Sequence, residues 1–181
     1  MAGILHGLMP DLLHRGSSLP LTADDFRKVM GQFATGVTII TAAHGKEHRG
    51  MTANSVCSVS LEPLSVLVCV NRTAHTHHVI AESGAFCVNI LSDSQEQLSR
   101  VCAKPDTPEA ELKGVSYRLG ETGSPVLEDI VAYVDCRVAA SFEFGTHTIF
   151  VGEAVDLGAE ERRPLMFYRG RYASLAEGTF A

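Results

Sequence analysis

Apolar and polar positions alternate most regularly over residues 50–61, which read G-M-T-A-N-S-V-C-S-V-S-L. At a period of two, this stretch predicts a single strand with two different faces. The mostly apolar face carries Met51, Ala53, Ser55, Cys57, Val59 and Leu61. The other face is short and polar apart from Val56, and it carries Thr52, Asn54, Ser58 and Ser60. Hydroxyl and amide groups so close to the backbone can hold a flat polar ligand, although the same pattern also fits an ordinary strand that turns its hydroxyl groups to water.

The spacing of other apolar residues predicts a few helices. The first begins at Thr22 or Asp24, which are both good N-caps, and its apolar side chains recur at helical spacing and predict a face toward the core. These side chains are Phe26, Val29, Met30 and Phe33. A short helix is predicted from Thr73, as its cap, to about residue 81. A third helix follows Ser92 and Gln95, which resemble a capping box, and it carries Leu98, Val101 and Cys102.

The remaining apolar segments are short and rich in β-branched residues, which predicts strands. They cover residues 36–43, 64–70, 85–91, 148–157, 165–168 and 172–175, together with a long strand within 128–144. Residues 64–70 are nearly all apolar, which is typical of a central strand buried on both faces. Gly145 and Thr146 mark the turn of a hairpin. Many strands and few helices indicate a mainly β protein with an antiparallel sheet or barrel and flanking helices that cover its ends.

Composition excludes several classes of function. The 181 residues fit one domain with a full-sized core, and 45% of them are hydrophobic and 20% charged, as in ordinary globular proteins. A formal net charge of -6 argues against a nucleic acid as the main partner. No apolar run approaches the roughly 18 residues of a membrane span, so we expect no membrane association.

The start of the chain has little periodicity and no basic segment, and Pro10 and Asp11 interrupt it, so no signal peptide is predicted. We expect residues 1–21 to form a mobile arm, or one that orders against a partner subunit, and residues 22–181 to form the domain. The cysteines are Cys57, Cys69, Cys87, Cys102 and Cys136. Their odd number and the lack of a C-x-x-C pair indicate reduced, buried thiols in a cytoplasmic protein.

Common catalytic and nucleotide-binding motifs are missing from the sequence. It contains no G-x-G-x-x-G, no G-x-x-x-x-G-K-[ST] and no G-x-S-x-G. The segment T-A-H-T-H-H places His75 and His78 on one helix face, with His77 between them. Without paired cysteines or a second histidine cluster the set of metal ligands is incomplete, so we predict no metal site and a solvated helix start instead.

Two further places are candidate sites. Arg72, Thr73 and Thr76 lie at a predicted helix N-terminus, where backbone N–H groups, hydroxyls and a guanidinium can bind an anion such as phosphate. Simple helix capping is the alternative there. His147 follows the hairpin turn, and loop tips carry function more often than strand interiors, although an ordinary surface histidine is the commoner case.

Segments along most of the chain, taken in order, resemble the short-chain flavin reductases. They read F-R-K-V-M-G-Q-F-A-T-G-V-T-I-I-T, R-G-M-T-A-N-S-V-C-S-V-S-L-E-P-L-S-V-L-V-C-V, G-A-F-C-V-N-I-L, G-T-H-T-I-F-V-G-E and Y-R-G-R-Y. The T-A-N-S-x-x-S-V-S part is the most specific, and the resemblance runs from about Phe26 to Leu175. It implies an antiparallel, Greek-key-like FMN-binding split β-barrel that forms a homodimer with its flavin site near the subunit interface.

The resemblance also implies roles for individual residues. Those that match the loop beside the flavin are Thr35, Gly36, Val37 and Thr38. Those that match the strand along the isoalloxazine ring and ribityl chain are Thr52, Ala53, Asn54, Ser55, Ser58 and Ser60. Arg72 and Thr76 match the phosphate end, and Tyr172 matches an aromatic residue near the same pocket. Gly145 and His147 match a G-D-H motif whose histidine lies near the nicotinamide, but Thr146 stands where that motif has aspartate.

The function that the resemblance implies is an NAD(P)H-dependent flavin reductase that supplies reduced FMN or FAD to a partner monooxygenase. Hydride passes from nicotinamide C4 to flavin N5, a step that needs two rings stacked about 3–3.5 Å apart and no nucleophile or strong base from the protein. In this scheme His147 is the catalytic-site residue that places the nicotinamide. Two alternatives stay open: a flavoprotein reductase that passes electrons to a metal centre such as a cobalt corrinoid, and a flavin- or haem-binding module without turnover. The residues do not distinguish FMN from FAD, or NADH from NADPH.

Overall fold

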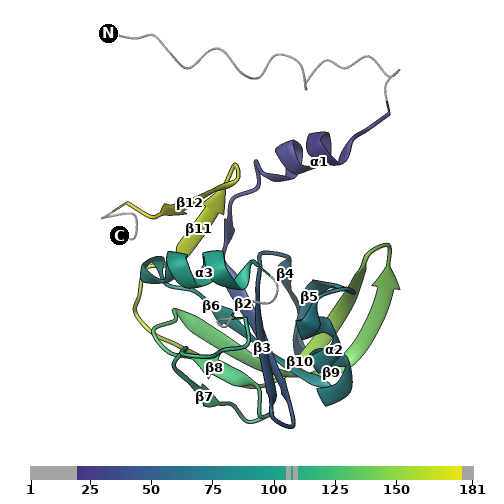
Figure 1. The fold of residues 1–181 in the computed structure, drawn as a ribbon, viewed down its shortest axis with the longest axis vertical. Coiled ribbons are helices and arrows are strands. Elements are labelled where there is room, and N and C mark those ends of the chain that lie inside the picture. Colours follow the sequence, from purple (N-terminus) through teal and green to yellow (C-terminus); the bar gives the residue numbers. More distant parts are fainter. Residues whose placement is uncertain (1–19, 105–106, 108–109, 177–181) are drawn as a thin grey trace.

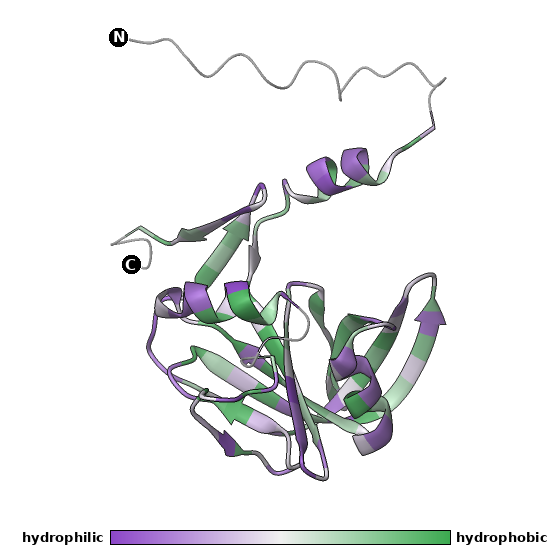
Figure 2. Ribbon diagram, in the orientation of Figure 1, coloured by the Kyte–Doolittle hydropathy of each residue, from purple (hydrophilic) through white to green (hydrophobic). Residues whose placement is uncertain are grey.

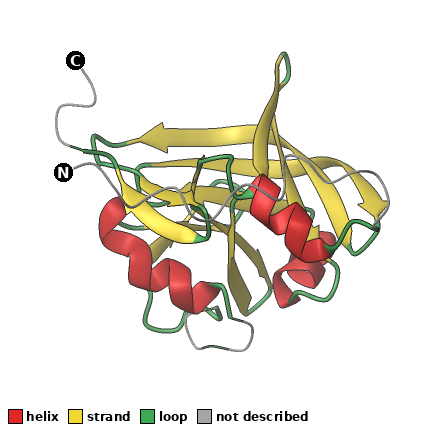
Figure 3. Cartoon of the chain, turned by 90° about the horizontal axis from the view of Figure 1, so that it is seen from above, coloured by secondary structure: helices red, strands yellow, loops and turns green. Residues whose placement is uncertain are grey.

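The computed structural model describes residues 20–104, 107 and 110–176. Antiparallel strands make up most of it, and the helices lie at its periphery (Figure 1, Figure 3). The strands are β1 (Thr35–Gly36), β2 (Thr38–His44), β3 (Glu47–Ala53), β4 (Val56–Leu61), β5 (Leu64–Asn71), β6 (Ala85–Ile90), β7 (Tyr117–Leu119), β8 (Pro125–Leu127), β9 (Ala132–Phe144), β10 (His147–Ala159), β11 (Leu165–Tyr168) and β12 (Arg171–Ser174). The helices are α1 (Ala23–Met30), α2 (His75–Ser83) and α3 (Glu96–Cys102), the last preceded by the 3-10 helix η1 (Asp93–Gln95). The prediction of a mainly β fold with antiparallel pairing and a few flanking helices is confirmed.

A seven-stranded sheet forms the centre of the molecule, in the order β3-β2-β6-β9-β10-β5-β4. β3 and β4 are its two edges, yet only Asn54 and Ser55 separate the end of one from the start of the other. The distance from Ala53 to Val56 is three Cα steps, which span at most about 11 Å. The sheet therefore curls until its edges nearly meet at this point. The result is a barrel that is split along one side.

The prediction of a single strand over residues 50–61 is wrong. β3 ends at Ala53, and β4 begins at Val56 on the opposite edge of the sheet. The alternation continues unchanged through the break, although Asn and Ser side chains favour turns. Consequently the predicted row of polar residues is divided between two strands, with Thr52 on β3 and Ser58 and Ser60 on β4.

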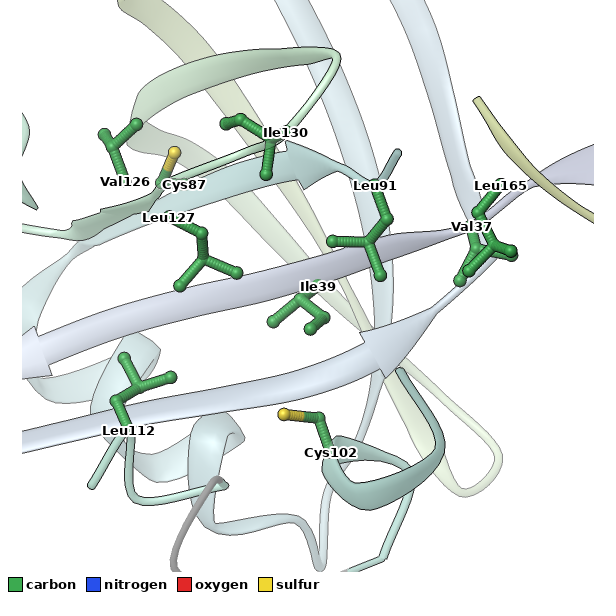
Figure 4. Packing of buried hydrophobic residues seen from close by; sticks show 10 residues of the cluster. All are labelled: Val37, Ile39, Cys87, Leu91, Cys102, Leu112, Val126, Leu127, Ile130 and Leu165. Atoms are coloured by element: carbon green, nitrogen blue, oxygen red, sulfur yellow. The ribbon is translucent and has the colours of Figure 1, made fainter. Parts of the chain in front are cut away.

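The strand buried on both faces is β2 and not the segment 64–70, for which the prediction is wrong. β5 lies beside the edge strand β4, and only Val68 and Val70 of its residues are fully buried. On β2, by contrast, Ile39 and Ile40 point into different core clusters. Figure 4 shows the first cluster, in which Leu112 and Cys102, which are not on strands of the sheet, lie in the same cluster as Ile39.

Helix α1 begins where the sequence predicts. Thr22 and Asp25 form a capping box, in which the Asp25 N–H donates to Thr22 Oγ1 at 3.1 Å and the Thr22 N–H donates to Asp25 Oδ2 at 3.3 Å. The prediction that its apolar side chains face the core is wrong for the single chain. Phe26 is 67% exposed and Phe33, just after the helix, is 71% exposed, and α1 stands clear of the sheet (Figure 1, Figure 2). Helical spacing shows that a face is apolar, and it does not show what covers that face.

Helix α2 begins at His75, so the prediction that Thr73 is its cap is wrong. The N–H and the hydroxyl of Thr73 both donate to Asn71 Oδ1 at 2.9 Å and form a turn before the helix. The capping box at Ser92 and Gln95 is confirmed, and α3 follows it.

A two-stranded sheet of β7 and β8 is not predicted by the sequence patterns. The buried side chain of Asn89 on β6 holds it in place, because Nδ2 donates to the Ile39 carbonyl at 3.1 Å and Oδ1 accepts from the Leu127 N–H at 2.8 Å. These partners are far apart in the sequence, which is why periodicity does not reveal the strands.

The cysteines are all free thiols. Cys87, Cys102 and Cys136 are buried as predicted, whereas the prediction is wrong for Cys57, which is exposed on β4, and for Cys69, which is half-buried on β5. None of the described helices is long and apolar enough to cross a membrane. The predicted arm over residues 1–21 lies outside the described residues except for its last two positions.

Candidate functional site

A groove runs along β3 from β12 to the first turn of α2, and we call it the β3 groove. It consists of two adjoining cavities of about 320 Å³ and about 200 Å³, which share Thr52 and Ala103 in their walls. The smaller cavity is completed by Val37, Ala53, Asn54, Phe167 and Tyr172. The larger cavity continues to Arg49, Asn71, Thr73, Thr76 and Lys104.

Hydrogen bonds between three elements hold the middle of the groove. Thr52 Oγ1 on β3 donates to the Ser99 carbonyl on α3 at 2.7 Å, and Ser99 Oγ lies 2.9 Å from the hydroxyl of Tyr172 on β12. Because the Thr52 proton is already used, its hydroxyl offers only lone pairs to a ligand. Thr52 can therefore accept a hydrogen bond from a ring N–H but cannot donate one without losing its contact with α3.

The end of the groove at β12 is aromatic. The rings of Phe167 and Tyr172 meet edge to face with centroids 5.3 Å apart, and the guanidinium of Arg100 lies 4.5 Å from the centroid of the Tyr172 ring. An aromatic wall backed by a cation is suited to contact with a flat conjugated ring.

The predicted loop of residues 35–38 reaches the same end of the groove. Val37 is buried in the wall, and Thr38 Oγ1 donates to the Ala53 carbonyl at 2.7 Å. Asn54 is exposed, with its Nδ2 3.4 Å from Thr35 Oγ1. Gly36, next to Thr35 in β1, pairs with β11 and is also exposed. Tertiary packing thus brings the loop together with the Ala53–Asn54 segment.

The opposite end of the groove lies at the N-terminus of α2. Its N-cap Ala74 provides no side-chain hydrogen bond, and no acidic residue occupies the first turn, so backbone N–H groups there are available to an anion. Thr76 is only 3% exposed and lines the cavity, and its hydroxyl makes no hydrogen bond within the described part of the chain. Lys104 lines the same cavity, and so does Arg49, which already pairs with Glu47 at 2.8 Å and with Glu111 at 3.4 Å. This end is built to receive a negative group.

Arg72 does not line the groove. Its Nη1 pairs with Glu143 Oε2 at 2.7 Å, and both side chains are largely exposed. Its predicted role at the phosphate would require the guanidinium to leave Glu143, at a small cost for so exposed a pair.

The three serines that are predicted to contact the flavin lie outside the groove. Ser55 Oγ donates to the Cys69 carbonyl at 3.0 Å, and Ser60 Oγ donates to the Glu62 carbonyl at 2.9 Å. Ser58 is exposed on β4. Their residue types predict ligand contacts. However, the hydroxyl protons of Ser55 and Ser60 are donated to nearby backbone carbonyls, and Ser58 faces solvent on the edge strand.

His147 is the first residue of β10 and directly follows the turn at Gly145, whose φ of +57° favours glycine. Its ring is exposed, with Nδ1 2.9 Å from Thr146 Oγ1. In the sheet it pairs with Asn71, which lines the groove. His147 therefore lies beside the phosphate-like end of the groove without forming part of its wall.

The clustered histidines have different surroundings. His75 lines the larger cavity, whereas His77 turns inward and contacts Thr148 through Nε2. Among the described residues, no three His, Cys, Asp or Glu side chains gather in a way that could hold a metal ion.

Sequence reasoning missed several residues of the groove. Ser99, Phe167 and Lys104 carry no local signal, because they reach the groove through tertiary packing of α3 and β11 against β3. Arg49 alone had a signal, since it opens the R-G-M-T-A-N-S segment.

Comparison with known proteins agrees with this geometry. Residues 30–176 match the family described as Flavin reductase like domain, which is most of the chain. The chain belongs to this flavin reductase family.

Individual relatives of this flavin reductase domain fall into the same class. The chain is 39% identical over 155 residues to the reductase subunit of a flavin-dependent monooxygenase from Mycobacterium tuberculosis. The aligned region covers 83% of this chain and 81% of the relative. It is 36% identical over 155 residues to an FMN reductase (NADH) from Stutzerimonas stutzeri, covering 85% and 88%. Among solved structures, an NADH:FAD oxidoreductase from Streptomyces globisporus, in complex with NAD and FAD fragments, superimposes with a TM-score of 0.80 at 36% identity, covering 87% of this chain and 94% of the other.

Thr76→Val is expected to weaken FMN binding about tenfold, because the variant keeps the shape of the side chain and removes one hydrogen bond to a charged group. Riboflavin, which lacks the phosphate, should bind wild type and variant alike. Fluorescence titration of both ligands measures this difference. Equal losses of FMN and riboflavin affinity in Thr76→Val would remove Thr76 from the anion site.

The same titration with Arg72→Ala decides whether the guanidinium leaves Glu143 for the phosphate.

Proposed function

We propose that the protein is an NAD(P)H:flavin oxidoreductase that delivers reduced flavin to a partner monooxygenase in the cytoplasm. Membership of the flavin reductase family supports this, and so do the relatives, one of which is a monooxygenase reductase subunit and another an FMN reductase (NADH). Both FMN and FAD remain as the flavin. The relatives named for their donor use NADH, which favours NADH over NADPH.

The observation that carries the proposal is the agreement between the β3 groove and the parts of a flavin. A flavin nucleotide has a flat ring at one end and a phosphate at the other. The groove offers the apolar and aromatic side chains of Val37, Phe167 and Tyr172 at one end. At the other it offers an uncapped helix N-terminus and the hydroxyl of Thr76, a residue that is only 3% exposed and lines the cavity.

Bound flavin would supply the redox chemistry, by accepting a hydride and passing electrons to the next acceptor. The role of the protein is to hold and orient the flavin and the nicotinamide. Thr52, whose hydroxyl proton is donated to Ser99, would accept a hydrogen bond from the ring, and the first turn of α2 with Thr76 would anchor the phosphate. His147 places the nicotinamide from the adjoining hairpin. Hydride transfer needs no proton from the protein, in keeping with the lack of acidic side chains among the described residues that line the groove.

The test is oxidation of NADH and of NADPH by the purified protein, with FMN, FAD or no flavin added. Absorbance follows the nicotinamide, and the spectrum of the protein as purified shows whether flavin is held tightly or treated as a substrate. Turnover that depends on added or bound flavin supports the proposal. A protein that binds flavin and oxidises neither nucleotide would be a binding module instead.

We further propose a homodimer. Its support is the exposed apolar surface of β9, where Phe142 is 58% and Phe144 is 81% exposed, and that of α1. Alternation along β9 and β10 places these phenylalanines on the sheet face opposite the core residues Thr148 and Phe150, together with His147. Large apolar surfaces of this kind mark interaction sites.

Phe144→Glu is expected to shift the mass measured by light scattering from two subunits to one at micromolar concentration, because burying a carboxylate in an apolar interface is unfavourable. Leu119→Glu, at a 55% exposed apolar position on β7, is the matched control and should leave the mass unchanged. A wild-type mass of one subunit would contradict the dimer.

A further inference from the structure

His77 stands behind the β3 groove and contacts both elements that carry its proposed ligands. It directly follows Thr76 in the first turn of α2. Its Nε2 lies 2.8 Å from Oγ1 of Thr148, which directly follows His147 on β10. One side chain therefore joins the helix turn at the phosphate end to the strand that carries the nicotinamide residue.

The surroundings of the His77 ring favour one neutral form. Nδ1 is buried and has no hydrogen-bond partner among the residues that the structure describes. A buried N–H without an acceptor is rarer and costlier than a buried lone pair, so we place the proton on Nε2, which donates to Thr148 Oγ1. The ring centroid lies 5.3 Å from that of Phe150, so the His77 ring also packs against a residue of the second core cluster.

The charges around His77 come from three elements. Burial lowers the pKa of His77, and His78 on the same helix lowers it further. Glu143 on β9 raises the pKa, and Arg72 before α2 lowers it. The net direction is downward, so His77 stays neutral at pH values where an ordinary histidine begins to gain a proton.

Other contacts between α2 and the hairpin are less suited to fixing this turn. The Arg72 N–H donates to the Thr146 carbonyl at 3.0 Å, before the helix begins. The ion pair between Arg72 and Glu143 is exposed and contributes little. The buried apolar anchors of α2, Val79 and Ile80, come after its first turn. The contact between His77 and the buried Thr148 is a side-chain hydrogen bond that ties the first turn itself to β10.

We propose that His77 is a positioning residue. Its hydrogen bond to Thr148 fixes the position of the first turn of α2 relative to His147. The inference rests on the proposed reductase function. It has a specific consequence: loss of this bond loosens the phosphate contact of Thr76 and the nicotinamide contact of His147 together, although His77 touches neither ligand.

The sharpest test uses two variants of Thr148. Thr148→Val keeps the shape of the side chain and removes the hydroxyl, and Thr148→Ser keeps the hydroxyl. For Thr148→Val we expect FMN affinity to fall about three- to tenfold and the KM for NADH to rise by a similar factor, as for loss of one hydrogen bond. Thr148→Ser should stay near wild type in both. Riboflavin affinity should change little in either variant, because riboflavin has no phosphate.

His77 itself is tested by a double-mutant cycle. If the two side chains act through one bond, His77→Leu combined with Thr148→Val should lose no more FMN affinity than the more damaging single variant. His78→Gln, at the exposed neighbouring position, is the control and should keep the FMN affinity of wild type. The free energy of unfolding adds an independent readout. Because the folded protein resists protonation of His77, wild type should lose stability relative to His77→Gln as the pH falls below about 6.5, and not above it.

The outcomes that overturn the inference are distinct from those that overturn the function. Equal behaviour of Thr148→Val and Thr148→Ser, or equal losses for FMN and riboflavin, would leave His77 with a structural role alone. Additive effects in the double-mutant cycle would mean that the two side chains act independently. If wild type fails to oxidise NADH, the proposed function fails, and the comparison of FMN with riboflavin still decides the role of His77.

Discussion

Replacing Gly152 with alanine is expected to lower the free energy of unfolding by about 3 kcal/mol, at the upper end of the usual range for overpacking a core. A Cβ atom at this position on β10 would lie 2.5 Å from Cζ of Phe86 and 2.7 Å from Cβ of Cys136. Phe86 is completely buried in the second core cluster, and the close packing of protein interiors opposes a shift of its ring. The ring of Phe86 and the Cβ of Cys136 therefore lie directly against the backbone of β10, which requires glycine here.

Gly36→Ala provides the matched control for this prediction. No atom lies within 4 Å of a Cβ built at Gly36, so its free energy of unfolding should stay within about 0.5 kcal/mol of wild type. Urea unfolding of both variants at the same subunit concentration gives the comparison, because dimer formation would make the midpoint depend on concentration. Equal stability of the two variants would show that the core around Phe86 yields to an added methyl group.

Replacing His147 with alanine is expected to slow reduction of bound flavin about ten- to hundredfold and to raise the apparent KM for NADH, as for loss of a positioning contact. Flavin affinity should barely change, because the proposed flavin contacts lie on β3, α2, β11 and β12 and not on β10. The contact between His147 Nδ1 and Thr146 Oγ1 orients the ring, so Thr146→Ala should reduce the rate in the same direction by a smaller factor.

Anaerobic stopped-flow measurement of flavin reduction isolates this step. His44→Ala is the control, since His44 is also an exposed histidine next to a hairpin turn but belongs to the β2–β3 hairpin. If His147→Ala reduces bound flavin at the wild-type rate and with the wild-type dependence on NADH, His147 is an ordinary surface residue and the donor site lies elsewhere.

Features that depend on neighbouring residues could be predicted from the sequence. The N-cap at Thr22 and the capping box at Ser92 are both present, because each joins groups three residues apart. The hairpin turn at Gly145 is also correct, as are the short strands near the end of the chain. The antiparallel, mainly β class follows from many short apolar segments joined by turns. A window of a few residues is enough to predict these features.

The candidate site could be predicted only in part. Thr52, Ala53, Asn54, Thr76 and Tyr172 all line the β3 groove. The serines of β4 do not, and the reason is the break at Asn54–Ser55, which sends the chain to the opposite edge of the sheet. A period-two pattern reports which way a side chain points along one strand, and it carries no information on which edge that strand occupies.

What the sequence by itself determined was therefore the local chemistry: caps, turns, strand periodicity and the residue types that can meet a flat ring and a phosphate. The tertiary structure decided which of them meet. It joined Thr52 to Ser99 on α3, tied His77 to Thr148 on β10, and turned the apolar side of α1 to the exterior of the single chain. These contacts connect residues that are far apart in the sequence, and they depend on the curl of the seven-stranded sheet. Their stability comes from packing of the whole core, so no short stretch of the sequence contains them.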